Sequence, residues 1–113
     1  MSIRNLTPHT VTLLVGGRRV EVPASGILPR VVEQEAAAPP VTVSGVEVPV
    51  VEVRLGTVQG LPERAAGVFL VVPRAVAQAH PHRDDLLIPY RLVRDPGGAV
   101  VGCAAFARVM AGS

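Results

Sequence analysis

The alternation of apolar and polar residues predicts a chain built mainly of β-strands. Residues 11–15 form an apolar run, and residues 18–22 alternate between charged and valine positions, as in a strand with one buried face. Gly16 and Gly17 join the two runs, and a two-residue Gly-Gly link of this kind is typical of a β-hairpin. The first unit expected from the sequence is therefore a hairpin over residues 11–22.

Similar short segments recur along the chain, separated by turns that contain Gly or Pro. Residues 46–55 are the longest alternating segment, although Pro49 cannot donate to a strand ladder and indicates an edge or a bulge. Residues 68–72 are uniformly apolar, which is typical of a central strand buried on both faces. The other expected strands are residues 27–33, 41–43, 91–94 and 99–109.

A single short helix is expected at residues 73–79, where Pro73 suits a first helical turn and an Ala-rich stretch follows. Pro81 ends it. Two helical turns are not stable alone, so this helix must pack on the sheet. Loops or turns are expected at residues 36–40, 44–45, 56–62, 80–90 and 95–98. The sequence therefore predicts a mainly β (α+β) fold, an antiparallel sheet of hairpins with one short helix.

Length and composition favour one small domain over residues 1–113. A chain of this size can bury one core without metals or disulfides. Cys103 is the one cysteine and lies in an apolar run, which indicates a buried structural thiol. Hydrophobic residues make up 49% of the chain and charged residues only 18%. Such apolar surplus is often buried between subunits, and we therefore expect a homo-oligomer.

The charges argue against nucleic acid and membrane partners. The net charge is +2, and the eleven basic residues, all Arg, are scattered rather than gathered into the stripe expected of a duplex-binding protein. The longest apolar stretches are shorter than a membrane span, and the N-terminus lacks the pattern of a signal peptide. We therefore expect a cytoplasmic protein, located in the host cell if a phage encodes it.

Residues 80–85 are the densest polar cluster, with the sequence His-Pro-His-Arg-Asp-Asp. His and Asp are metal ligands, but Arg83 within the cluster would repel a cation. A solvated loop in which Arg83 pairs with an acid is the favoured interpretation, and a metal-dependent site is the alternative. Cys103 has apolar neighbours that make it inert, and the serines lie in turns or at the termini. We therefore expect no catalytic residues, no metal and no cofactor.

Several arginines lie on expected strands close in sequence to the few aromatic residues. An Arg fork for phosphate and a ring for a base are the smallest set that binds a nucleotide. A solvated sheet face with salt bridges is the alternative interpretation. The residues concerned are Arg54, Arg91, Arg94 and Arg108, with Tyr90 and Phe106.

The order of several short segments resembles a known family. The chain opens with Asn-Leu-Thr-Pro-His-Thr at residues 5–10, and its middle reads Val-Glu-Val-Arg-Leu-Gly-Thr-Val-Gln-Gly-Leu-Pro at residues 51–62. Arg-Asp-Asp-Leu follows from Arg83, and Val-Arg-Asp-Pro-Gly-Gly-Ala-Val-Val-Gly-Cys from Val93. Together they resemble small phage and prophage proteins of the first Thoeris anti-defence family, over most of residues 3–108.

The resemblance implies a non-catalytic sponge that inhibits bacterial anti-phage defence. Such proteins bind cyclic ADP-ribose isomers, such as glycocyclic ADP-ribose, and some also hold cyclic trinucleotides. They form dimers that build into hexamers and enclose the nucleotide near the dimer contact. The alternatives are a phage-derived structural or interaction oligomer without a small ligand, and a small metal-dependent nucleotide hydrolase that uses residues 80–85.

The resemblance also implies which residues bind the ligand. Arg54 matches an arginine of the family's middle strand, and Arg108 matches one near its C-terminus. Where the family pattern has an Asn this chain has Tyr90, and His80 or His82 stands where the family has an aromatic ring. The full set of expected ligand-binding residues is Arg54, Arg108, Tyr90, Phe106, His82, Arg83 and Asp84.

Overall fold

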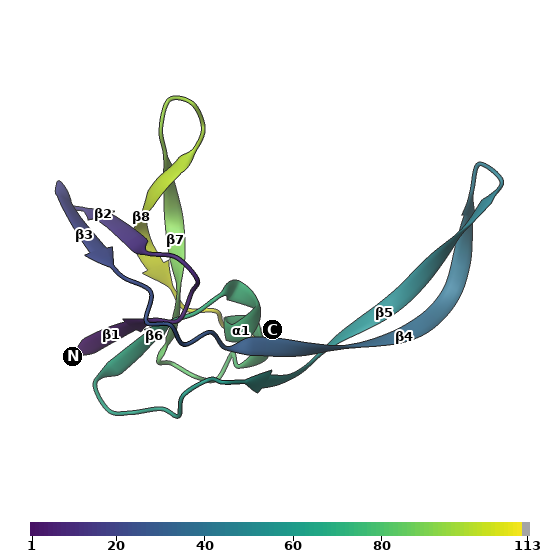
Figure 1. Ribbon diagram of the computed structural model, residues 1–113, viewed down its shortest axis with the longest axis horizontal. Coiled ribbons are helices and arrows are strands. Elements are labelled where there is room, and N and C mark those ends of the chain that lie inside the picture. Colours follow the sequence, from purple (N-terminus) through teal and green to yellow (C-terminus); the bar gives the residue numbers. More distant parts are fainter. Residues whose placement is uncertain (112–113) are drawn as a thin grey trace.

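The computed structural model describes residues 1–111, which form eight strands and one short helix (Figure 1). In chain order these are β1 (Ser2–Asn5), β2 (Val11–Val15), β3 (Arg18–Val22), β4 (Arg30–Val43), β5 (Val46–Gln59), β6 (Val68–Val71), α1 (Arg74–Ala79), β7 (Leu86–Arg94) and β8 (Val100–Ala107). The predicted mainly β fold with one short helix is confirmed for this part of the chain.

The strands form two separate sheets. The large sheet has the order β1-β6-β7-β8-β2-β3, and β4 and β5 pair only with each other as a long hairpin that projects from it (Figure 1). We call residues 30–59 the arm. The large sheet is mixed rather than purely antiparallel, because β1–β6, β6–β7 and β2–β8 are parallel pairs. Helix α1 makes the crossover between β6 and β7, as a parallel connection requires.

The turns predicted from local sequence are confirmed. Gly16 and Gly17 join β2 to β3 with φ of 60° and 74°, and Ser44 and Gly45 join β4 to β5 with φ of 50° and 79°. Positive φ at both central residues matches the twist of the flanking strands. At the β7–β8 turn the Gly98 N–H donates to the Asp95 carbonyl over 2.9 Å.

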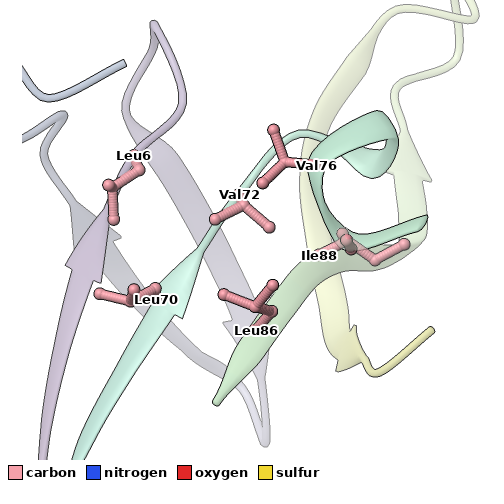
Figure 2. Close-up of a cluster of buried hydrophobic side chains, with 7 residues drawn as sticks. Leu6, Leu70, Val72, Val76, Leu86 and Ile88 are labelled. Atoms are coloured by element: carbon pink, nitrogen blue, oxygen red, sulfur yellow. The ribbon is translucent and has the colours of Figure 1, made fainter. Parts of the chain in front are cut away.

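A first hydrophobic cluster lies between α1 and the large sheet (Figure 2). The helix begins at Arg74, directly after Pro73, and ends at Ala79, and it packs on the sheet as predicted, through Val76 and Ala77. The buried members of the cluster are Leu6, Leu70, Val72, Val76, Ala77, Leu86 and Ile88. Val31 and Val58 from the base of the arm pack against it, so the arm is anchored at this end.

The second cluster contains Val11, Val71 and Cys103, with the half-buried Phe106 packed against it. Val71 therefore contributes to one cluster while its neighbours Leu70 and Val72 contribute to the other. This alternation confirms β6 as the two-sided central strand predicted at residues 68–72. The free thiol of Cys103 is 2% exposed, so its expected burial is also confirmed.

The arm corrects the loops predicted at residues 36–40 and 56–62. Residues 30–43 form one continuous strand despite Pro39 and Pro40, and β5 continues to Gln59. Each strand of a two-stranded ribbon has one free edge, where a proline needs no ladder partner. The register shifts between Ala38 and Val41, opposite Pro49, so the irregularity inferred from Pro49 exists and its extra residue lies on β4.

One strand begins earlier than predicted, within the loop expected at residues 80–90, and one strand was not predicted. β7 starts at Leu86 rather than at residue 91, because it pairs with β6 at its start and with β8 beyond. Residues 2–5 form β1 beside β6. The polar segment that follows β1 is ordered by Asn5, which is 1% exposed. Its side-chain amide donates to the carbonyls of His9 and Val22 and accepts from the backbone and hydroxyl of Thr7.

Candidate functional site

The connector, residues 80–85 between α1 and β7, is held by a bidentate pair between Arg83 and Asp85. Arg83 donates from Nε and Nη2 to the two Asp85 oxygens over 3.0 Å and 2.6 Å. Both of its Nη groups also donate to the Pro62 carbonyl at 3.1 Å. Asp85 is 4% exposed, and its carbonyl accepts from the Leu70 N–H. The pair therefore joins the loop after β5, the connector and the large sheet.

This pairing sets the charge of both side chains. The hydrogen bonds from Arg83 lower the pKa of the Asp85 carboxyl, against the opposing effect of burial. The same hydrogen bonds raise the pKa of the Arg83 guanidinium. Asp85 therefore stays ionised at neutral and mildly acidic pH, and Arg83 has its donors engaged within the protein. The Arg83–acid pair expected from the sequence is present, with Asp85 as the acid.

Arg64 and Arg108 meet at the neighbouring residue, Asp84. Arg64 Nη2 lies 2.7 Å from Asp84 Oδ1, and Arg108 donates from Nε to the Asp84 carbonyl over 2.9 Å. The side chains of Arg64 and Asp84 are 60% and 58% exposed. The two arginines thus approach one residue from two segments that are far apart in the chain.

A surface cleft is built around this contact, and we call it the connector cleft. It is lined by Arg64, residues 65–69, Asp84, Asp85 and Arg108. Arg108 donates its Nε–H to the Asp84 carbonyl. A guanidinium has five N–H donors in a planar fork, so this contact uses one of the five. The cleft therefore offers two arginine forks close to an exchangeable, solvated carboxylate, an arrangement suited to an anionic group such as phosphate.

The predicted ligand-binding residues fall into two groups. Asp84 and Arg108 line the connector cleft, and Arg83 braces it through Asp85. Arg54 lies on the arm, where it pairs in register with Gln34 and lines a separate hollow with Glu35 and Glu52 as neighbours.

Tyr90, Phe106 and His82 do not line the connector cleft, whereas Phe69 does. Tyr90 is 48% exposed on β7 opposite Ala105, and Phe106 packs into the second hydrophobic cluster. His82 is exposed in the connector. Within residues 1–111, the structure thus places Phe106 as a core contact rather than as an open surface on which a base could stack.

Arg64 was not among the residues predicted to bind a ligand. It stands in an irregular loop between β5 and β6, twenty residues before Asp84, and no local pattern pairs the two. The sequence does contain a signal for Arg64 as a ligand-binding residue, since it lies in a loop in the sequence Glu-Arg-Ala-Ala-Gly. Small neighbours leave the arginine fork accessible.

The described residues contain no group of three or more His, Cys, Asp or Glu that could hold a metal ion. They also include no helix with the length and apolar character needed to cross a membrane. Comparison of the chain with family models, with curated proteins and with solved structures gives no match.

Proposed function

We propose that this protein binds a cyclic nucleotide signal and holds it unchanged, which inhibits a bacterial anti-phage defence in the cytoplasm. The resemblance to the first Thoeris anti-defence family supplies the ligand class, a cyclic ADP-ribose isomer such as glycocyclic ADP-ribose, with cyclic trinucleotides as a second class. The observation that carries the proposal is the convergence of Arg64 and Arg108 on Asp84 in the connector cleft.

The exchange of Asp84 for a ligand phosphate is energetically reasonable. An exposed ion pair contributes about 0–1 kcal/mol, so releasing Arg64 from the Asp84 carboxylate costs little. A phosphate can accept two parallel hydrogen bonds from each arginine fork. The diphosphate of a cyclic ADP-ribose isomer would then occupy the cleft, with Arg64 and Arg108 as its donors.

The connector cleft alone would not make a tight sponge. Nanomolar binding corresponds to about −12 kcal/mol, which two solvated arginines do not supply. The base and riboses have to be enclosed as well, since small-molecule sites normally bury most of the ligand surface. A second copy of the chain placed over the cleft would provide this enclosure, so the proposal includes a homo-oligomer.

The first experiment is a thermal melt of the full chain with and without each candidate nucleotide, followed by mass spectrometry of the recovered ligand. Ligand at one hundred times its dissociation constant stabilises by about 2.7 kcal/mol, a rise of roughly 10 °C for a domain near this size. We expect a rise with one class of cyclic nucleotide, recovered intact. No rise with any nucleotide would refute the proposal, and a cleaved product would assign the protein to the hydrolases.

Arginine variants locate the site. We expect Arg64→Ala and Arg108→Ala each to weaken binding at least tenfold, about 1.4 kcal/mol, in isothermal titration. Arg19→Ala is the matched control, because Arg19 is also exposed and pairs with one carboxylate, Glu21 at 2.8 Å. Arg54→Ala tests the residue predicted from the family pattern. Loss of binding in Arg54→Ala with full binding in Arg64→Ala and Arg108→Ala would move the site to the arm.

A second candidate function is an oligomeric interaction protein that needs no small ligand. The projecting arm favours it, because such a ribbon with exposed valines is an interaction element whether or not the connector cleft is occupied. Stable oligomers combined with no response to any nucleotide would select this function. The hydrolase alternative has less support, since Asp85 of residues 80–85 is already held by Arg83.

A further inference from the structure

The chain exposes more surface than its size requires. A compact monomer of 11.8 kDa is expected to expose about 5,900 Å² from the scaling of surface with mass, whereas this chain exposes 7898 Å². Its radius of gyration is 17.8 Å, compared with roughly 13 Å for a compact chain of this length. The excess, about 2,000 Å², is explained by the arm, which extends away from the large sheet (Figure 1).

The end of the arm carries an apolar face, made of Val41, Val43, Val46 and Val48. Val41 pairs with Val48 and Val43 with Val46, so the four side chains share one side of the ribbon. They are 50%, 57%, 62% and 39% exposed in that order. Thr42 and Glu47 pair on the opposite side. We call the four valines the distal apolar face.

The large sheet offers a matching surface. A cleft on it is lined by residues 10–12, Pro89, Leu92 and residues 100–103, and we call it the sheet cleft. Leu92 is 53% exposed, and Val100 and Val101 are 49% and 43% exposed. The distal apolar face and the sheet cleft are therefore two apolar surfaces of one chain, each open to solvent.

Within one chain these surfaces do not meet. The tip of the arm and the β7–β8 hairpin, which carries Leu92 and Val100, point in different directions from α1 and lie well apart (Figure 1). In a dimer with a two-fold axis, the arm of each copy can lie against the sheet of the other copy, so that both apolar surfaces of each chain are buried.

The charges of the two regions are complementary. The arm carries two Arg and four Glu, a formal charge of −2, and the rest of the chain carries nine Arg and five acidic residues, a formal charge of +4. Arg91 and Arg94 lie on either side of Leu92 on β7, and both are exposed. Two acidic arms repel each other, whereas an arm and the basic region of a second copy attract. Self-association of arm with arm is therefore disfavoured relative to arm with sheet.

We propose that the chain forms a symmetric dimer in which the distal apolar face of each arm packs into the sheet cleft of the other copy. The excess surface of the two chains, about 4,000 Å² in total, is an upper bound on the area that this contact buries, and a stable interface of standard size needs about 1,600 Å². The contact would also stabilise the arm, because a two-stranded ribbon is marginal in water unless something packs on it. This inference does not depend on the proposed nucleotide ligand.

Sedimentation velocity of the full chain tests the dimer. We expect wild type at twice 11.8 kDa, and Val43→Lys/Val48→Lys to raise the dimer dissociation constant more than about 100-fold, since each change acts twice across the two-fold axis. Thr42→Lys is the control, because it adds a lysine to the opposite side of the ribbon, with one added positive charge rather than two. A monomeric wild type, a dimer that survives the double change, or equal dissociation by Thr42→Lys would overturn the proposal.

Cross-linking gives an answer even if the double variant fails to fold. In a Cys103→Ala background, Val48→Cys and Leu92→Cys are introduced together and separately and treated with a flexible bis-maleimide. We expect a covalent dimer from the chain with both cysteines and little from either single-cysteine chain. No covalent dimer from the former, or an equal yield from Val48→Cys alone, would show that the arm does not occupy the sheet cleft.

Discussion

The large sheet and the arm use the same residue types with opposite results. Val71 and Val72 are completely buried in the large sheet, whereas Val43 and Val46 on the arm are more than half exposed. Among the described side chains, every buried hydrophobic one lies outside residues 30–59. Valine therefore specifies a strand in both regions but a core in only one. What differs is whether other elements pack over the strand: α1 covers Val72, and residues of β2 and β8 pack around Val71.

The largest expected contrast comes from truncation of one apolar side chain in each region. Leu70 is 2% exposed inside the first cluster, so Leu70→Ala should cost about 3 kcal/mol and lower the melting midpoint by roughly 10 °C. Val43→Ala should cost less than about 0.5 kcal/mol in dilute, monomeric samples. Thermal melts at several protein concentrations measure both. Equal losses in dilute samples would contradict the distinction between the regions.

A somewhat smaller contrast in stability is expected when a side-chain amide is removed from each region. Asn5→Ala removes the donors that serve the His9 and Val22 carbonyls within a buried segment, and should cost about 2–3 kcal/mol. Gln34→Ala removes an exposed amide from the arm and should stay within about 0.5 kcal/mol of wild type. Urea unfolding monitored by circular dichroism measures the free energy of unfolding of both variants. A stable Asn5→Ala protein would show that the segment after β1 is ordered by other contacts.

The smallest expected effect is a difference in the pH dependence of stability. The pKa of Asp85 is lower in the folded chain than in the unfolded one, so its ionisation stabilises the fold above the usual carboxyl pKa of about 4. This stabilisation is lost as pH falls through the lowered pKa of the folded state. Melting midpoints between neutral and strongly acidic pH should fall more steeply for wild type than for Asp85→Asn. Parallel profiles would mean that other carboxyl groups dominate acid unfolding.

Local signals predicted the parts of the fold that form from neighbouring residues. Gly16-Gly17, Ser44-Gly45 and residues 95–98 turn where expected, and Pro73 precedes the helix. The parallel pairs were not predicted, because β1 meets β6 and β2 meets β8 across most of the chain. The length of the arm was missed because Pro39 and Pro40 suggest a loop until the strand is known to have a free edge.

The candidate site shows the same division. Arg83 and Asp85 are two residues apart, and the pairing of Arg83 with a neighbouring acid was predicted from the sequence. Arg64 was missed because only the tertiary fold brings it to Asp84. Phe106 and Arg54 were selected by residue type and family pattern. The fold places Phe106 against the core and Arg54 on the arm.

The strand order of the large sheet also has a consequence for biosynthesis. β1 has no partner until β6 has left the ribosome, and the link between β2 and the rest of the sheet, through β8, comes last of all. The arm depends only on residues 30–59 and can close much earlier, since local contacts form before distant ones. A nascent chain would therefore carry a complete arm before the large sheet is complete. Premature termination before residue 100 would leave the β2–β3 hairpin without its partner strand β8, joined to β1 through contacts such as the hydrogen bond from Asn5 to the Val22 carbonyl.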